Sequence, residues 1–452
     1  MRAKRVTLAG MTTDVAADED PRVYEARGHA AQHHVDLAEA LYREIIQTKP
    51  DLAEALNFIG MCELGRGELA AATGHLERAA AAASSEAEVW KNVGIVHLAQ
   101  GHYGEALDAF DRALGIEPMH FATRLHRGAA YEQMGRLDDG AAAYFGAIAT
   151  AQTRGKWIND VSTPPQLRPV VRHAIRFVDQ HRKRIFHGWL APLRERHGAD
   201  ALARMDRAVD IYLDALEPEH RDPHQQCTFL YVPDLDPAPV FPRERLPWAA
   251  ALEGQLDAIR AELAEVLVQP VGMEPYLGSS DLARLRENHL LESLHGKGAW
   301  DAFFFDHHGQ PETRNRARCP RTVAALDAVP LMRLAGHAPR TLLSIIRGGT
   351  HVLPRHGVAN ARLTTWLPLR VPADCTFSID GVEQPLREGV CFSFDDTFEH
   401  EVCNRSDQPC IALSLDTWHP GLAGAEREAI AVLTREIGNF NRAARVNPPS
   451  PD

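Results

Sequence analysis

The stretch RTLLSIIRGGTHVLPRHGVANARLTTWLPLRV, residues 340–371, decides the fold of the second half of the chain. Its two ends are rich in apolar and β-branched residues, and its middle contains glycine, proline and two histidines, His351 and His356. β-Branched residues favour strands, whereas glycine and proline favour the turns between strands. The stretch therefore predicts two strands joined by a segment that carries chemically active side chains.

Further short strand-like runs follow at residues 375–381, 385–396, 398–404 and 410–418. Many short strands at a spacing of about ten residues are typical of a β-sandwich or a jelly roll. Residues from distant strands meet at the open end of such a fold. We therefore expect any site in this half of the chain to be built from several of these runs.

Two histidines are candidate metal ligands. His356 precedes one predicted strand, and His400 lies in another, directly after a turn with the sequence FDDT. Histidines on separate jelly-roll strands can hold one face of a metal ion, and imidazole suits Fe(II). Open coordination positions would then accept a co-substrate and O2. His351 lies within a predicted strand and is interpreted as a hydrogen-bonded strand residue.

Two motifs are highly specific: FDDTFEHEV at residues 394–402 and DTWHP at residues 416–420. Together with HRDPHQQCTFLYVPDL at residues 220–235 and the stretch 340–371, they resemble the aspartyl/asparaginyl β-hydroxylase family. The resemblance implies a double-stranded β-helix that binds Fe(II) through two histidines without a carboxylate ligand. It also implies that 2-oxoglutarate and O2 are used to hydroxylate the β-carbon of Asp or Asn in a peptide, or a small molecule.

The resemblance also implies roles for individual residues. His400 matches the second iron ligand, and Ser344 matches a co-substrate contact. Asn360 and Arg362 match positions that border the metal strand. The complete expected site consists of the metal ligands His356 and His400, the co-substrate contacts Ser344, Arg362, Trp366 and Arg405, and the substrate contacts Asn360 and Arg355.

The sequence departs from the family at the first iron ligand. Counted back from Asn360 without a gap, that position falls on Arg355, and His356 is one place late. A shift of one residue turns a strand side chain to the other face of the sheet. His356 can therefore act as the ligand only if a bulge or a loop at Gly357 absorbs the shift.

The positions that hold 2-oxoglutarate in the family are also changed. An Arg and a His are replaced by Thr364 and Trp366, and the Arg expected ten places after His400 is replaced by Cys410. Loss of such a charge-assisted contact in a partly buried site costs about 2–5 kcal/mol. Arg405 and Arg355 are candidate replacements.

Three interpretations therefore stay open. The first is an iron oxygenase of this family with a rearranged site, and the second is a β-helix domain that uses another co-substrate. The third is an inactive oxygenase domain kept as structure, with the first half of the chain acting as the binding module. In the third case Arg355 would point into the former iron position, paired with Asp395 or Asp396.

The first third of the chain repeats every 34 residues. Gly60, Gly94 and Gly128 fall in phase, as do bulky residues at positions 76, 110 and 144. This period, with small residues where helices touch, resembles the tetratricopeptide repeat. Such arrays of helix pairs present a concave groove, so we expect binding of a peptide or a partner protein.

The fold class predicted is α+β multidomain, an α-helical tetratricopeptide solenoid followed by a double-stranded β-helix (jelly roll). The net charge of −12 argues against a nucleic-acid partner, and no apolar run is long enough to span a membrane. Seven scattered cysteines without a CxxC pair favour a reducing, cytoplasmic location. The predicted divisions are a disordered N-terminus (1–20), repeats (21–152), a helical cap (153–220), the jelly-roll domain (221–422), and a C-terminal helix and tail (423–452).

Overall fold

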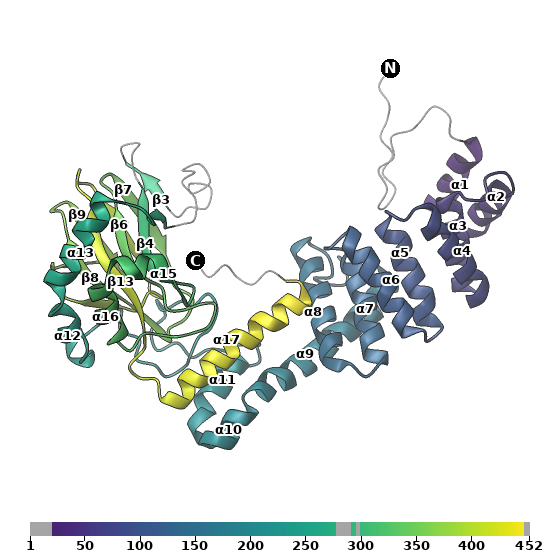
Figure 1. Ribbon diagram of the computed structural model, residues 1–452. Helices are drawn as coiled ribbons and strands as arrows, with labels where there is room; N and C mark the ends of the chain where they lie inside the picture. Colours follow the sequence, from purple (N-terminus) through teal and green to yellow (C-terminus); the bar gives the residue numbers. More distant parts are fainter. Residues whose placement is uncertain (1–19, 277–290, 295–298, 447–452) are drawn as a thin grey trace. The chain divides into compact units, whose positions relative to one another are not determined.

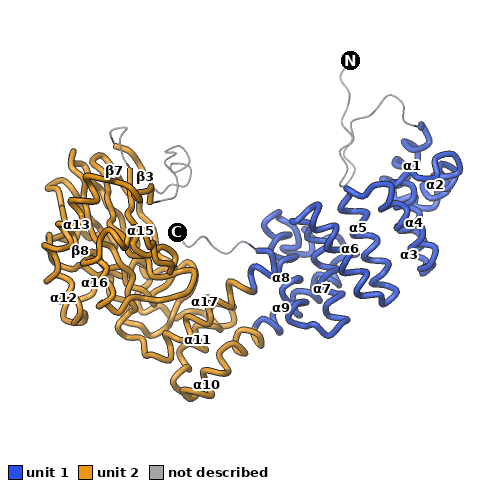
Figure 2. The backbone as a smooth tube through the Cα atoms, in the orientation of Figure 1, with its two compact units in different colours: residues 1–182, 440–447 blue, residues 183–439, 448–452 orange. Residues whose placement is uncertain are grey.

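The computed structural model describes residues 20–276, 291–294 and 299–446 (Figure 1). The predicted disordered N-terminus and the last residues of the predicted tail lie outside this range, apart from Asp20. The chain divides into two compact units (Figure 2). Unit 1 contains residues 1–182 and 440–447, and unit 2 contains residues 183–439 and 448–452. The segment 153–220, which the sequence suggested as a cap, is thus shared between the two units.

Unit 1 is built from consecutive antiparallel helix pairs, as the 34-residue period predicts. The repeat helices are α1 (Pro21–Ala31), α2 (Val35–Thr48), α3 (Ala53–Gly65), α4 (Leu69–Ala82), α5 (Ala87–Ala99), α6 (Tyr103–Ile116), α7 (Phe121–Gln133) and α8 (Leu137–Thr153). Helices α9 (Arg168–Trp189) and α17 (Gly424–Ala444) each contribute residues to both units.

The glycines in phase explain the repeat physically. A Cβ atom at Gly94 would lie 2.3 Å from the ring of Phe110, and one at Gly128 would lie 2.5 Å from the ring of Tyr144. Both rings are almost fully buried, so each aromatic residue packs against the bare backbone of the preceding helix. Only glycine permits this close approach, which is why the two positions recur together.

The β-rich part of unit 2 contains two antiparallel sheets. The larger has eight strands in the order β1-β11-β8-β13-β6-β4-β2, with β5 paired to β4, and the smaller has the order β10-β9-β12-β7-β3. The strands of the larger sheet are β1 (Val240–Phe241), β2 (Glu274–Pro275), β4 (Trp300–His307), β5 (Gln310–Pro311), β6 (Thr341–Ile346), β8 (Arg362–Arg370), β11 (Phe392–Phe394) and β13 (Cys410–Trp418). Those of the smaller sheet are β3 (Leu291–Ser293), β7 (Thr350–Arg355), β9 (Cys375–Ile379), β10 (Val382–Gln384) and β12 (His400–Asn404).

From β6 onward the chain moves back and forth between the two sheets. Strands β6, β8, β11 and β13 belong to the larger sheet, whereas β7, β9, β10 and β12 belong to the smaller one. This alternation is what a double-stranded β-helix requires, and that finer assignment stays a prediction. The antiparallel β region after a helical repeat array agrees with the predicted fold class.

Both faces of the larger sheet are buried, so its strands are apolar along most of their length. One face packs on the smaller sheet through a core that includes Trp366, Phe377 and Val402. The opposite face packs on the helices α13 (Leu256–Val268) and α16 (Pro320–Asp327), through a second core with Leu263 and Leu326. The other helices of unit 2 are α10 (Ala191–His197), α11 (Ala203–Tyr212), α12 (Ala249–Glu253) and α15 (Thr313–Arg318).

Candidate functional site

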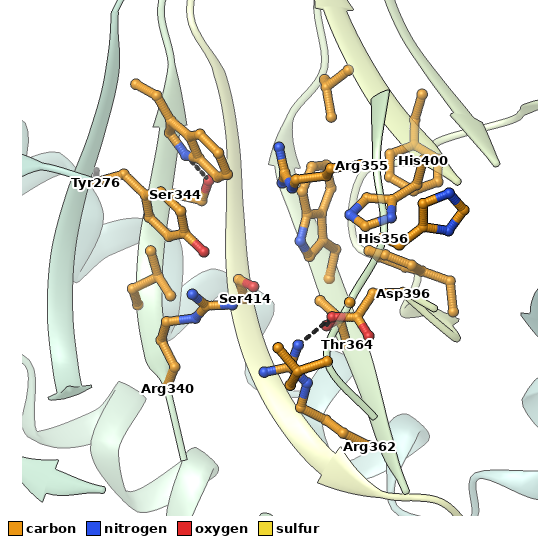
Figure 3. A pocket seen from close by; sticks show the side chains of 18 residues that line it. Tyr276, Arg340, Ser344, Arg355, His356, Arg362, Thr364, Asp396, His400 and Ser414 are labelled. Carbon is orange, nitrogen blue, oxygen red and sulfur yellow. Dashed lines mark hydrogen bonds and ion pairs between the residues drawn. The ribbon is translucent and has the colours of Figure 1, made fainter. Parts of the chain in front are cut away.

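A cavity of about 70 Å³ lies between the inner faces of the two sheets (Figure 3). Side chains at alternate positions of β6, β8 and β13 form one wall, and the ends of β7 and β12 contribute to the other. The volume corresponds to about five to seven waters, at roughly 10–15 Å³ each. The cavity therefore suits a small molecule or a single side chain.

His400 is the first residue of β12 and lines this cavity. It is buried, and its Nδ1 lies 3.0 Å from the carbonyl oxygen of Phe398. Because a carbonyl only accepts hydrogen bonds, the proton is assigned to Nδ1 and the lone pair to Nε2. Burial, with help from the charge of Arg355, lowers the pKa of His400 to about 4. The ring is therefore neutral at pH 7.

His356 follows the last residue of β7 and lines the same cavity. Its Nδ1 lies 3.0 Å from the carbonyl oxygen of Thr397, so it has the same assigned tautomer as His400. The chain turns at Gly357, whose N–H donates to the carbonyl of Asp396 over 2.5 Å. A Cβ atom at residue 357 would lie 2.1 Å from the carboxylate of Asp396, so glycine is required for this turn.

A bulge near the end of β7 decides which side chains face the cavity. Val352 pairs with Val402, but two residues earlier on β12 His400 pairs with Arg355 instead of Pro354. Strict alternation from Val352 would turn Pro354 inward and Arg355 outward. The extra residue turns Arg355 inward, opposite His400, and the turn that follows brings in His356 as well. The predicted local rearrangement therefore exists, and it places both residues on the cavity wall.

Arg355 has an environment that differs from the one expected for an inactive domain. Its guanidinium lies over the ring of Trp300, 4.9 Å from the ring centroid, and it forms no ion pair with any described residue. Asp395 instead bonds to Gln225 and Thr397, and Asp396 pairs with Arg362. The suggested pairing of Arg355 with Asp395 or Asp396 is therefore wrong.

Arg362 and Asp396 form a buried ion pair at the lower end of the cavity in Figure 3. The hydroxyl of Thr364 donates to the same carboxylate over 3.3 Å, and Asp416 lies 3.8 Å from the other arm of the guanidinium. Although burial opposes ionisation of both groups, Arg362 lowers the pKa of Asp396, while Asp396 and Asp416 raise that of Arg362. Both groups are therefore charged at pH 7.

Two other expected co-substrate residues line the cavity. Ser344 accepts a hydrogen bond of 2.9 Å from Nε1 of Trp300, which leaves its own hydroxyl proton free to donate. Trp366 contributes an apolar wall beside Phe377. The structure thus brings Ser344 and Trp366 together with Arg362.

Two expected contacts lie elsewhere. Asn360 is buried, and its side-chain amide makes both hydrogen bonds to the backbone of Val232, at 2.8 and 2.9 Å. It therefore anchors the segment before β8 and does not line the cavity. Arg405 is exposed after β12 and is absent from the cavity wall. The expectations of a substrate contact at Asn360 and a co-substrate contact at Arg405 are corrected accordingly.

Sequence reasoning missed three residues of the site: Tyr276, Trp300 and Arg340. They come from the ends of strands β2, β4 and β6 and meet only in the folded sheet. The arginine that opens the run TLLSII was the one available signal, because charged residues rarely begin a buried strand without a partner. His351, by contrast, bonds to Glu401 at 2.6 Å away from this cavity, as expected for a strand residue.

The two histidines satisfy one structural requirement for a metal site. In such sites the second ring nitrogen of a ligand histidine usually donates to a carboxylate or a backbone carbonyl. Both Nδ1 atoms do so here, and both Nε2 atoms remain free for a ligand. No group of three or more His, Cys, Asp or Glu side chains suited to a metal occurs within the described residues. The donor set that fits Fe(II) is thus limited to the two imidazoles.

Comparison with known proteins agrees with this geometry. Residues 253–420 match the aspartyl/asparaginyl beta-hydroxylase family. The chain carries an aspartyl/asparaginyl β-hydroxylase domain. Residues 25–87 and 87–120 match tetratricopeptide repeats, which confirms the repeat architecture. No helix of the described residues is long and apolar enough to cross a membrane.

Relatives of the hydroxylase domain are found in vertebrates and bacteria. Aspartate beta-hydroxylase domain-containing protein 2 of Xenopus tropicalis is 26% identical over 209 residues, 46% of this chain and 54% of that protein. Ornithine lipid ester-linked acyl 2-hydroxylase of Rhizobium tropici is 29% identical over 186 residues, 40% of this chain and 61% of that protein. The chain thus spans about half the length of the vertebrate relatives. A solved structure of MamA protein covers 30% of this chain and 75% of its own, at 20% identity and a TM-score of 0.27.

Proposed function

We propose that unit 2 is a non-haem iron oxygenase that hydroxylates a peptide or an amino-acid-derived substrate. Fe(II) would be held by His356 and His400, with O2 and an oxo-acid such as 2-oxoglutarate as co-substrates. The observation that carries the proposal is the matched geometry of the two imidazoles, whose Nδ1 atoms bond to the consecutive carbonyls of Thr397 and Phe398.

The surroundings of the imidazoles favour metal binding over simple packing. Two hydrogen bonds to one short backbone segment fix the orientation of both rings, so little conformational entropy is lost when a metal binds. The lowered pKa of His400 keeps its Nε2 lone pair free of a proton at pH 7. A packing histidine in the same place would need neither two free Nε2 atoms nor a shared cavity.

Bound Fe(II) would supply O2 activation, which no amino-acid side chain provides. The residues of the chain would prepare the cavity for that chemistry. Trp366, Phe377 and Phe394 form an apolar wall that excludes water. The Arg362–Asp396 pair fixes the turn before β8 and holds a permanent charge pair at one end of the cavity.

An anaerobic titration with Fe(II) tests the proposal. Wild-type protein is expected to bind one Fe(II), and His356→Ala and His400→Ala should each weaken binding by at least about tenfold, since each removes one of two protein ligands. His351→Ala is the matched control, because His351 lies on the same strand but bonds to Glu401 outside the cavity. Equal affinity in all four proteins would contradict the assigned ligands.

Arg355 supports a second candidate function. A guanidinium opposite His400 repels a metal dication, and it faces the cavity where the family expects an imidazole. The domain would then bind a small ligand without iron, and the repeats would act as the functional module. The same titration separates the two functions, because failure of wild-type protein to bind Fe(II) would favour the second.

We also propose that the tetratricopeptide groove of unit 1 binds a peptide or a protein, which would be either the substrate or a separate partner. All seven cysteines are free thiols in the structure. From this and the acidic net charge we infer a reducing, cytoplasmic location and no nucleic-acid partner. Pull-down of the full chain with and without residues that line the groove would test the binding role.

A further inference from the structure

Three guanidinium groups line the cavity of unit 2, against one carboxylate. Arg340, Arg355 and Arg362 are the cations, and Asp396 is the anion (Figure 3). Arg362 is neutralised by its ion pair with Asp396. The side chains of Arg340 and Arg355 have no hydrogen bond or ion pair to any residue in the described part of the chain. Two positive charges of the cavity are thus left without a protein counter-charge.

Both of these arginines are held in place by aromatic rings. Arg340 lies over Tyr276, 5.1 Å from its centroid, and Arg355 lies over Trp300 at 4.9 Å. Tyr276 and Trp300 stack on each other at 3.7 Å, with their planes 12° apart. The four side chains therefore form a continuous stack with a cation at each end. Stacking on aromatic faces orients a guanidinium and leaves its N–H groups free to bind an anion.

The electrostatics of the stack favour an anionic ligand. Burial lowers the pKa of Arg355, but a guanidinium keeps its proton at any physiological pH. Two partly desolvated cations in one cavity repel each other, and neither has a carboxylate partner among the described residues. A charged group in such surroundings is stabilised by pairing with an opposite charge. A ligand with two negative groups would satisfy both arginines at once.

The uncharged groups of the cavity also favour an anion. The hydroxyls of Tyr276, Ser344 and Ser414 line the same space, and Figure 3 shows the first of these directed toward it. Ser344 already accepts from Trp300, so its remaining role is that of a donor. Carboxylates accept several such bonds, whereas amides and alcohols offer fewer acceptors. A cavity of about 70 Å³ admits a small acid and excludes a folded or extended peptide segment.

We propose that Arg340 and Arg355 form a binding site for a small dicarboxylate, one arginine for each carboxylate. The site would replace the basic residues that Thr364, Trp366 and Cys410 do not supply. The identification of this ligand as the oxygenase co-substrate rests on the proposed function, but the binding of the dicarboxylate does not require iron. Arg340 and Arg355 are therefore the residues that select the ligand.

Isothermal titration calorimetry on the full chain tests this site. Metal is first removed with a chelating resin, because soluble chelators such as EDTA are themselves polycarboxylates. Succinate and 2-oxoglutarate are the probes at fixed ionic strength, and succinamide is the uncharged analogue. Both acids are expected to bind and succinamide is not. Arg340→Gln and Arg355→Gln should each weaken binding by about 10- to 100-fold, the range for one hydrogen-bonded charge contact.

Arg405→Gln is the matched control, because Arg405 is exposed on the same unit and away from the cavity. Arg340→Lys and Arg355→Lys keep the charge and should lose less affinity than the Gln variants, which separates loss of binding from loss of folding. Equal binding by wild type and both Gln variants, or no binding of either acid, would overturn the site. Iron binding without dicarboxylate binding would refute this inference alone, and dicarboxylate binding without iron binding would refute the proposed function alone.

Discussion

Replacing Gly357 with alanine should destabilise unit 2, because the turn at this residue presses its backbone against a buried carboxylate. The new Cβ would lie 2.1 Å from Oδ1, 2.4 Å from Cγ and 2.8 Å from Oδ2 of Asp396. Ordinary contact begins at 3.4 Å, so the carboxylate would have to move by about 1.3 Å, the difference between 3.4 and 2.1 Å. It has no free direction, since Arg362 and Thr364 hold its other oxygen.

The magnitude follows from the two ways in which this clash can be relieved. If Asp396 and Arg362 shift together, the cost is that of an overpacked core, about 1–3 kcal/mol of unfolding free energy. If the ion pair breaks, one charge stays buried without a partner, at about 3–5 kcal/mol. We therefore expect Gly357→Ala to lower the free energy of unfolding by at least about 1 kcal/mol. Its Fe(II) affinity should also fall, because His356 is carried by the same turn.

Urea unfolding of the full chain, followed by tryptophan fluorescence, measures this change. Hydrogen–deuterium exchange of strand β8 assigns the affected transition to unit 2. Gly254→Ala is the matched control, since its Cβ would meet only carbonyl oxygens at 3.5 Å, and it should change stability by no more than about 0.5 kcal/mol. Equal stability of Gly357→Ala, Gly254→Ala and wild type would refute the role assigned to this turn.

Three further predictions concern other parts of the molecule. Gly94→Ala should destabilise unit 1 by about 1–3 kcal/mol because its Cβ meets the buried ring of Phe110, whereas Gly104→Ala has open space and should be neutral or stabilising in thermal unfolding. Burial lowers the pKa of His419 to about 4, below the 6.5 of an unfolded histidine, so the unfolded state binds more protons between these values. Stability should therefore fall as the pH falls from 6.5 to 4, by up to about 3 kcal/mol, and this part of the slope should vanish in His419→Gln unfolding titrations. Arg355→His removes a positive charge and adds an imidazole opposite His400, so Fe(II) affinity should rise by about tenfold or more in the same titration used for wild type.

The sequence predicts the repeat architecture well because its determinants are local and periodic. Gly94 and Phe110 lie in one repeat unit, and their contact recurs in the next unit as Gly128 and Tyr144. The short strands of unit 2 are also predictable, since their β-branched and aromatic residues alternate between two buried layers. The boundary near residue 220 is less well predicted, because helix α9 belongs to both compact units and no composition change marks its division.

The candidate site is only partly predictable. His400, Ser344 and Trp366 lie on regular strands, so their positions follow from alternation. The orientations of Arg355 and His356 depend on a bulge in β7 that no residue pattern announces.

Contacts made across the sheets are harder still to foresee. The stack of Arg340, Tyr276, Trp300 and Arg355 joins four strand ends that are far apart in the chain, so its existence depends on strand order. Asn360 shows the converse case. Its match to a family position indicated a substrate contact, whereas its amide is fully used by the backbone of Val232.

The central claim is that His356 and His400 hold an iron ion that works with an oxo-acid. The most direct measurement is the visible absorption of the full chain with one equivalent of Fe(II) and excess 2-oxoglutarate, under anaerobic conditions. The account predicts an iron-to-ketoacid charge-transfer band that is absent in His400→Ala and retained in His351→Ala. Absence of the band in wild-type protein, or its persistence in His400→Ala, would contradict the account.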